Sequence, residues 1–300
     1  MKIFTALYFC SLLYGFASDD VNSNEPRIDI VDKTGSQNFG FYFIDQFGDI
    51  KNHFLFKNHE VGANHYTIHT SNPLLIILTK GNFSAHPVFI EPGDTCEIYF
   101  DGESYQIKGQ KSSEDLSIFS ALERELGYVF PDFSGIKLSK RLDLTYLLEQ
   151  HKKRYFDRKE FLDNYEREHI VSSRYAEVAK QAIYYKYLRG ILYPFYVSGD
   201  TEKLESTDIS ETYYLQVLRI LEPASFDDSL LFLEDYRLFV WNYCRFLSRE
   251  YLGTSEEFSS LFECAKANFS GKTRDFLMFY ILKNTAGQVF IVLKHVFNTS

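Results

Sequence analysis

Basic residues are in the minority in this 300-residue sequence, where 32 lysines and arginines stand against 41 aspartates and glutamates, a formal net charge of -9. This balance provides no positive surface to neutralise phosphates, so we do not expect a nucleic-acid partner. The sequence also lacks the C-x-x-C, H-E-x-x-H and G-x-S-x-G patterns, which mark thioredoxin-type redox sites, helical zinc sites and hydrolase nucleophiles. We therefore predict no catalytic residue, no metal site and no cofactor.

Long apolar runs are missing outside the N-terminus. Lys2 precedes a largely apolar run of about 14 residues, Ile3 to Phe16, which is shorter than the roughly 20 residues needed to span a bilayer. Gly15 and Ala17 place small residues at the minus-three and minus-one positions of a signal-peptidase site. Residues 1–17 are therefore predicted to be a cleaved secretory signal peptide, with no transmembrane segment after cleavage.

Cysteine is also scarce. Cleavage of the signal peptide removes Cys10 and leaves Cys96, Cys244 and Cys264, an odd number in an oxidising compartment. Cys96 shares a strand face with apolar residues, which favours a core thiol. The other two lie ten residues either side of Thr254, where a turn between two antiparallel helices is expected. They would therefore lie at the same level along the axes of the two helices. A Cys244–Cys264 disulfide is a hypothesis, and two buried free thiols are the alternative.

Residues 27–110 are predicted to form a small antiparallel β domain, either a sandwich or a sheet. Their apolar and polar residues alternate over short segments that are separated by turn residues. The sharpest signal is Val88 to Phe100, in which Pro92 and Gly93 suit the two central positions of a tight turn between alternating segments. This segment is expected to be a β-hairpin.

Residues 111–300 are predicted to form an all-α helical domain, which makes the fold class α+β. The apolar period changes to 3.6 after Ser112, and Leu116, Phe119 and Leu122 line one face of a first helix. The 29 Phe and 22 Tyr residues indicate core packing more than a ligand platform. Further helices are expected at about Leu142–Glu166, Ser173–Tyr193, Ser210–Leu221, Ser229–Tyr251, Thr254–Phe269 and Lys272–Asn284.

Several short motifs resemble functional sites without meeting their requirements. Gly271-Lys272-Thr273 matches the end of a phosphate-binding loop, but the first glycine of that motif would fall on Lys266 and a helix precedes it. His65 and His69 share one face of an expected strand, where residues four apart are roughly 13 Å apart, too far to chelate one ion alone. Carboxylates such as Glu234 and Asp235 follow helix N-termini, where the helix dipole favours them.

Two segments carry a resemblance to a known family. The first is V-F-I-E-P-G-D-T-x-x-I-Y-F, and it is followed by Ile107-Lys108-Gly109. The second is Phe269 to Leu277, which contains G-K-x-R-D-x-L. Together with a signal peptide, they resemble the N-terminal region of TlpA-like, thioredoxin-superfamily thiol-disulfide oxidoreductases. The resemblance implies a location in the periplasm or cell envelope of a Gram-negative bacterium. In that family a C-terminal thioredoxin domain with W-C-x-x-C carries the activity.

This chain departs from the family pattern at the redox site. It has no C-x-x-C, its one tryptophan is Trp241 within an expected helix, and 15 residues follow Thr285, far fewer than the roughly 100 of a small domain. No redox residue can therefore be carried over. The chain is expected to be either a truncated relative or an N-terminal region retained for binding.

Two functions follow as hypotheses. The first is a non-catalytic secreted or periplasmic protein that contacts envelope proteins or a small ligand within a redox system. The second is a secreted small-molecule binder or enzyme whose site is assembled from aromatic and carboxylate residues distant in sequence, with Tyr184, Tyr185, Tyr187 and Phe195 forming a cleft. A W-C-x-x-C sequence encoded directly downstream would favour the first. A eukaryotic origin is a further alternative, because three tripeptides fit the N-glycosylation acceptor.

Overall fold

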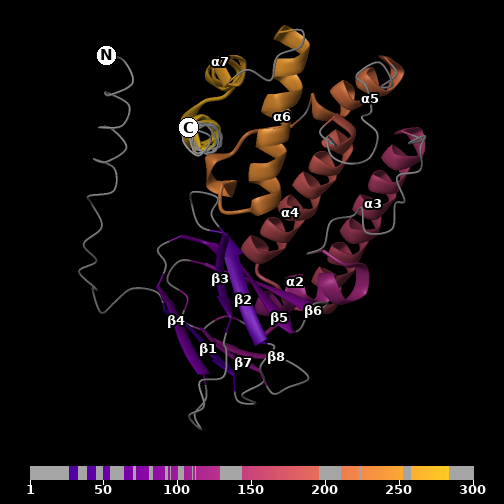
Figure 1. Cartoon of the computed structure of the whole chain (residues 1–300). Helices are drawn as coiled ribbons and strands as arrows, with labels where there is room; N and C mark the ends of the chain where they lie inside the picture. Colours follow the sequence, from indigo (N-terminus) through magenta and orange to yellow (C-terminus); the bar gives the residue numbers. More distant parts are fainter. Residues whose placement is uncertain are drawn as a thin grey trace, which may run out of the picture.

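A computed structural model gives the architecture of the chain, and it has an α+β fold in which the strands gather at one end and most helices at the other (Figure 1). The signal peptide and Thr254 lie outside the described residues. These comprise 27–32, 39–44, 50–54, 64–69, 72–80, 84–91, 94, 96–100, 105–109, 111, 113–128, 144–195, 211–222, 224–252 and 258–283.

The first of two four-stranded sheets has the strand order β4-β1-β7-β8. Its central pair, β1 (Arg27–Asp32) and β7 (Cys96–Phe100), is parallel, whereas β4 (Asn64–His69) and β8 (Tyr105–Gly109) each pair antiparallel with their neighbour. The expected purely antiparallel arrangement is therefore wrong for this pair. A parallel pair requires a crossover connection, and here the second sheet lies in the connection between β1 and β7.

The second sheet is antiparallel throughout, with the order β3-β2-β5-β6. It contains β2 (Phe39–Ile44), β3 (Ile50–Phe54), β5 (Leu74–Lys80) and β6 (Ser84–Ile90). Pro87 is tolerated in β6 because this strand lies at the edge of the sheet as described, where a missing N–H breaks no ladder. The adjoining helix covers this strand, and the Ser120 hydroxyl donates to the Pro87 carbonyl across 2.8 Å.

The expected hairpin between β6 and β7 is also wrong. A turn does follow β6, because the Asp94 amide donates to the Glu91 carbonyl across 3.2 Å. However, β6 belongs to one sheet and β7 to the other. An alternating pattern around a tight turn looks the same whether the second strand folds back on the first or continues into another sheet. The segment is a corner between two sheets.

The helices match the expected periodic segments closely, with one exception. The expected helix from Ser229 begins instead at Glu234, after a short 3-10 turn, η2 (Asp228–Leu230). Residues 271–283 are also helical. The other elements are α2 (Ser113–Leu126), α3 (Leu144–Glu168), α4 (Ser173–Leu192), η1 (Tyr193–Phe195), α5 (Glu211–Leu221), α6 (Glu234–Leu252) and α7 (Phe258–Asn268).

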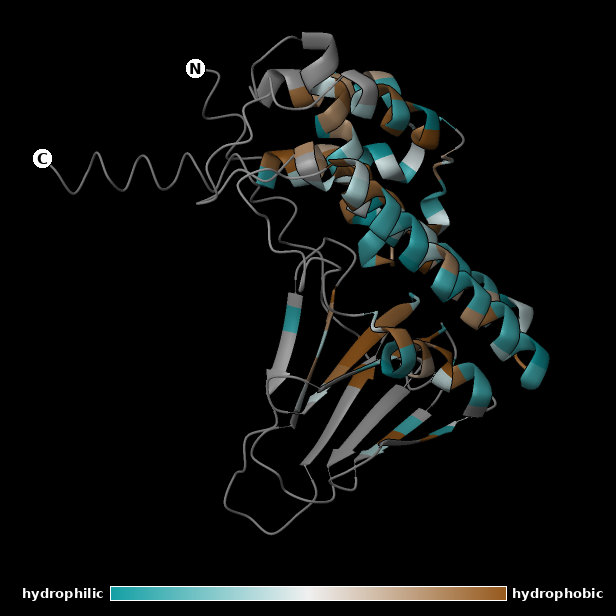
Figure 2. Ribbon diagram, turned by 90° about the vertical axis from the view of Figure 1, so that its right-hand side faces the viewer, coloured by the Kyte–Doolittle hydropathy of each residue, from teal (hydrophilic) through white to brown (hydrophobic). Residues whose placement is uncertain are grey.

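Helix α4 is the centre of the helical part. Small residues and aromatic rings line its buried faces, and it contacts α2, α3, α5 and α6. Gly190 of α4 makes room for the buried imidazole of His151, since a Cβ there would lie 2.6 Å from the His151 Nδ1 atom. Helix α3 covers this layer and turns a mostly hydrophilic face outward (Figure 2). No helix among the described residues is both long and apolar enough to cross a membrane.

The hydrophobic core runs without interruption from the strands into the helices. Val88 and Ile90 of β6 belong to the same cluster as Phe119 of α2 and Tyr175 of α4. The Phe89 ring lies 5.2 Å from the Tyr175 ring in an edge-on contact, an arrangement that aromatic pairs prefer. Packing of this kind holds α2 and α4 against β6 of the second sheet.

Candidate functional site

A cleft of about 180 Å³ lies where the end of β2 meets α6 and helix 271–283. Four of its lining residues share one stripe of α6 at positions i, i+3, i+4 and i+7. Two more lie one turn apart on helix 271–283. The lining comprises Ile44, Glu234, Arg237, Leu238, Trp241, Phe276 and Tyr280.

Three aromatic rings form a connected wall of the cleft. Trp241 and Tyr280 meet edge to face with centroids 5.1 Å apart, and Phe276 stacks beside Tyr280 at 5.6 Å. The guanidinium of Arg245 lies 5.9 Å from the Trp241 ring, within the range of a cation–π contact. Because the rings already support one another, this wall is preorganised for an apolar ligand.

Glu234 carries the one carboxylate among the described residues that line the cleft. Glu234 is solvent-exposed, yet desolvation by the surrounding protein, and then the charge of Asp235, raise the pKa of its side chain. The cations Arg189, Arg237 and Lys186 act in the opposite direction. A carboxylate that contacts water and is nevertheless partly desolvated is typical of a concave site.

The next residue of α6, Asp235, faces a buried polar cluster rather than the cleft. Arg189 donates to its carboxylate across 2.8 Å and the Tyr128 hydroxyl donates across 3.1 Å. The Lys186 ammonium lies 5.1 Å from the centre of the Tyr128 ring. Burial, followed by Asp235, raises the pKa of Tyr128 well above its usual range. Asp235 is therefore a partnered structural charge that holds α6 against α4 and the end of α2.

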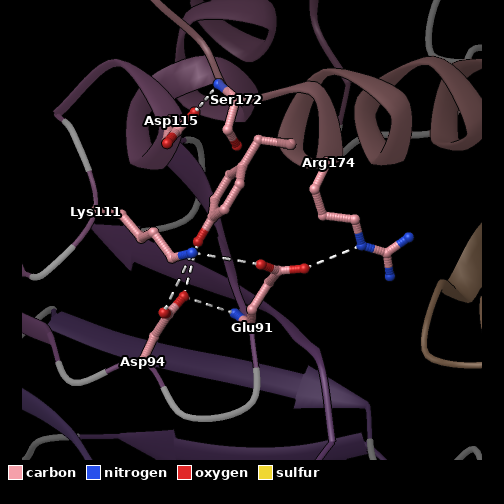
Figure 3. Close-up of polar contacts among 7 residues, drawn as sticks. Glu91, Asp94, Lys111, Asp115, Ser172 and Arg174 are labelled. Atoms are coloured by element: carbon pink, nitrogen blue, oxygen red, sulfur yellow. Dashed lines mark hydrogen bonds and ion pairs between the residues drawn. The ribbon is translucent and has the colours of Figure 1, made fainter.

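The corner between the two sheets carries a second polar network, which joins the strands to α4 (Figure 3). The buried Asp94 carboxylate accepts from the Glu91 amide across 3.1 Å and from the Tyr175 hydroxyl across 2.9 Å. Arg174 forms an ion pair with Glu91 at 3.0 Å, and Lys111 bridges Glu91 and Asp94 at 3.6 and 3.8 Å. These contacts bind protein groups to one another and leave Glu91 and Asp94 with a structural role.

The segment that resembles a phosphate loop is the start of helix 271–283, and an internal carboxylate takes the position of a phosphate. The Lys272 and Thr273 amides donate to Asp228 across 2.8 and 2.7 Å, and the Thr273 hydroxyl donates across 2.8 Å. Although desolvation opposes it, these hydrogen bonds lower the pKa of Asp228. Gly271 has φ +59°, and a Cβ there would lie 2.3 Å from the carboxylate. Asp228 is thus a long-range helix cap.

Cys244 of α6 and Cys264 of α7 are both buried and close together. The Cys264 thiol donates to the Cys244 carbonyl at 3.4 Å, and the Cys244 thiol points to the Leu261 carbonyl at 3.7 Å. The hydrogen bond to Cys264, and then burial, raise the pKa of Cys244. Both are free thiols in this structure, and their pairing under oxidising conditions stays a prediction. Cys96 lies in β7, opposite Ile28 and Gly109.

Of the aromatic residues that the sequence suggested for a cleft, the three tyrosines pack near one another around Tyr155 and Tyr236, and Phe195 packs against α6. Tyr185 is buried against Tyr236, with centroids 4.7 Å apart. Tyr184 lies 6.1 Å from Tyr155, and Tyr187 stacks on that same ring at 5.0 Å. Phe195 meets Phe246 at 4.8 Å. The ring-lined cleft is built from other residues, which the stripe on α6 could have indicated.

Metal-ligand groupings are not found among the described residues, where no three or more His, Cys, Asp or Glu side chains are placed to hold an ion. His65 and His69 lie in β4, in register with Val31 and Arg27.

Comparison with known proteins gives no relative: no protein-family model, curated protein or solved structure matches the chain. The resemblance to TlpA-like oxidoreductases gains no support from these searches. The geometry of the cleft is therefore the main guide to function.

Proposed function

We propose that this chain is a non-catalytic secreted protein that binds a small ligand in the cleft between α6 and helix 271–283. Three connected rings, one carboxylate and one guanidinium around about 180 Å³ carry the proposal. Small-molecule sites are commonly concave and mostly apolar, with a few charged or polar groups that fix the orientation of the ligand. The cleft has this composition, and its residues come from distant parts of the sequence.

The proposal places the protein in the periplasm or cell envelope of a Gram-negative bacterium, as a contact module that corresponds to the N-terminal region of a TlpA-like oxidoreductase. The proposal includes a more specific fold, in which the strands of residues 27–110 form a β sandwich and a helical domain follows. The two segments that carry the resemblance support a structural module. Glu91 and Asp94 join the sheet corner to α4, and the Lys272 and Thr273 amides bind Asp228.

Ligand binding is tested by filling the cleft. A panel of small organic molecules is screened by thermal shift against the wild-type chain and Leu238→Trp, which adds an indole at the cleft wall. Compounds that stabilise the wild type through the cleft should lose their effect in this variant. Leu215→Trp is the matched control, because Leu215 is exposed on α5 at 45 % and the substitution is chemically the same.

The contradicting outcome is a panel in which no compound separates wild type from Leu238→Trp. Secretion is tested separately by the intact mass of the exported protein. We expect a chain that begins at or near Ser18. A product that retains Met1 contradicts the signal peptide without bearing on the cleft.

A further inference from the structure

The surface that the cleft offers to a ligand is mainly apolar. Trp241 and Tyr280 meet edge to face, and Phe276 stacks beside Tyr280. Covering such surface is favourable in proportion to the apolar area that leaves water. Part of each of four apolar lining residues is still uncovered, because they are half-buried: Ile44, Leu238, Trp241 and Tyr280.

The size of the cleft limits what can cover this surface. An apolar cavity of about 150 Å³ holds one benzene molecule, and the cleft measures about 180 Å³. A ligand of about six to ten non-hydrogen atoms therefore fits. A single ring or a branched aliphatic chain has this size and matches the ring wall.

The charge of Glu234 is offset by cations of the protein itself. Desolvation and the charge of Asp235 raise the pKa of Glu234, whereas Arg189, Arg237 and Lys186 lower it. Arg237 is buried, with 4 % exposure, and already interacts with protein groups. An ammonium ligand beside Glu234 would face these cations as well, and their repulsion would offset the attraction of the carboxylate.

An anionic ligand finds no cation of its own in the cleft either. Arg189 is paired with Asp235 at 2.8 Å. Lys186 is buried, and its ammonium lies 5.1 Å from the centre of the Tyr128 ring. Glu234 is the charged lining residue that is exposed, and it repels an anion. The cleft therefore favours neither sign of charge.

We infer that the cleft binds a small uncharged molecule with an apolar body, either a single ring or a branched aliphatic chain, in which any polar group is neutral. This inference rests on the proposed function and specifies its ligand class. The rings, Ile44 and Leu238 cover the body, and a neutral group such as a hydroxyl stays on the solvent side. A charged group would lose hydration on entry without a net gain from the charges of the cleft.

Trp241 is a natural probe of this site, because it lines the cleft and is the one tryptophan of the chain. Its emission is titrated at neutral pH with cyclohexylmethanol, cyclohexylmethylamine and cyclohexanecarboxylate. These compounds share one saturated ring and carry a neutral, a cationic and an anionic group, respectively. The alcohol should bind at least about tenfold more tightly than either charged compound, because it enters without the loss of ionic hydration.

Glu234→Gln keeps the shape of the side chain and removes its charge. It should leave the affinity for cyclohexylmethanol within about twofold, because the alcohol has no charge, and strengthen binding of the carboxylate at least about threefold, because the like charge is gone. Glu263→Gln is the matched control, because Glu263 is exposed on α7 and lies outside the cleft. It should leave all three affinities unchanged.

The outcomes separate the ligand class from the site itself. The uncharged class is overturned if the amine or the carboxylate binds as tightly as the alcohol, or if Glu234→Gln does not strengthen carboxylate binding. When a charged compound stabilises the wild type and not Leu238→Trp, the class is wrong and the cleft remains a binding site. If neither this series nor the wider panel separates wild type from Leu238→Trp, the proposed function fails as well.

Discussion

The hydroxyl of Tyr175 donates a hydrogen bond of 2.9 Å to the carboxylate of Asp94, and both residues are buried. Tyr175 lies in the first turns of α4 and Asp94 lies at the corner between the sheets, so this bond joins the strands to the central helix. The bond also holds the corner in one orientation against α4. Desolvation, and then the hydrogen bond to Asp94, raise the pKa of Tyr175 above its usual range, which keeps the hydroxyl a donor.

Removing this hydroxyl is the first prediction. Tyr175→Phe should lower the free energy of unfolding by about 1–3 kcal/mol, because a buried carboxylate loses a hydrogen-bond donor. Tyr184→Phe is the control on the same helix, since it removes a hydroxyl and keeps the ring packed near Tyr155 and Tyr185. Denaturant unfolding of both variants measures the difference. Equal losses in the two variants would show that the Asp94 contact contributes nothing specific.

The helix cap at Asp228 gives the second prediction. Asp228→Ala should destabilise the protein by about 1–2 kcal/mol, the usual cost of losing an N-cap side chain. Asp275→Ala is the control, because Asp275 is exposed on the same helix and forms an ion pair with Arg274 at the surface. It should change the free energy of unfolding by less than about 0.5 kcal/mol.

The same carboxylate predicts an acid dependence. Its pKa is lowered in the folded chain, so its stabilising effect is present above the pKa of the unfolded chain, about 4, and is lost as the pH falls through the folded pKa. The difference in unfolding free energy between wild type and Asp228→Asn should therefore shrink in acid. A difference that stays constant between neutral pH and pH 3 would contradict the cap.

Much of the helical part could be predicted from the sequence, because its signal is local. The expected helix Ser173–Tyr193 matches α4 within one residue, since its apolar period and the following Pro194 are both visible in the chain. The start of α6 could not be predicted in this way. Asp227 caps Ser229 in a short turn, and Asp228 turns toward residues 272 and 273, a contact that spans more than forty positions.

The sheets and the cleft also depend on long-range contacts that local sequence patterns do not specify. Alternation identified β6 and β7 as strands but could not assign them to different sheets, because the choice depends on contacts with α4 at Glu91 and Asp94. In the cleft, the stripe from Glu234 to Trp241 is readable as one helix face. Its meeting with Phe276 and Tyr280 depends on how helix 271–283 is held by Asp228, and no local pattern specifies that.

The third prediction concerns alkaline stability. Burial raises the pKa of Tyr236 to about 12, whereas tyrosine in an unfolded chain titrates near 10. Between pH 10 and 12 the unfolded chain therefore loses this proton while the folded chain keeps it, so stability falls as the pH rises. A difference of about two pKa units corresponds to at most about 2–3 kcal/mol. The Tyr236→Phe variant has no hydroxyl to titrate at this position, so it should not show this loss of stability.

The measurement compares unfolding free energies of wild type and Tyr236→Phe at several pH values. At pH 7 the variant should be less stable by about 1–2 kcal/mol, because it loses the contacts of the hydroxyl with the Asp227 amide and Thr273. Toward pH 12 the difference in unfolding free energy between wild type and Tyr236→Phe should disappear. Parallel curves over this range would show that Tyr236 does not titrate differently in the two states.

The last prediction is a disulfide between Cys244 and Cys264 in the exported protein. The two buried thiols lie on α6 and α7, with the Cys264 sulfur 3.4 Å from the Cys244 carbonyl. Loss of two protons and two electrons to a disulfide oxidant of the exporting compartment would form the bond. By the chain-entropy model, a bridge closing a loop of this length stabilises the fold by about 3 kcal/mol.

Non-reducing peptide mapping of the exported chain should recover the two cysteines in one linked peptide. Dithiothreitol should then lower the melting temperature of the wild type and leave the double variant Cys244→Ser/Cys264→Ser unchanged. Cys96→Ser is the control, because the predicted bridge does not include it, and it should keep the response to dithiothreitol. Recovery of both peptides as free thiols from oxidised, exported protein would eliminate the bridge and leave Cys244 and Cys264 as packing residues, a common state for buried cysteine.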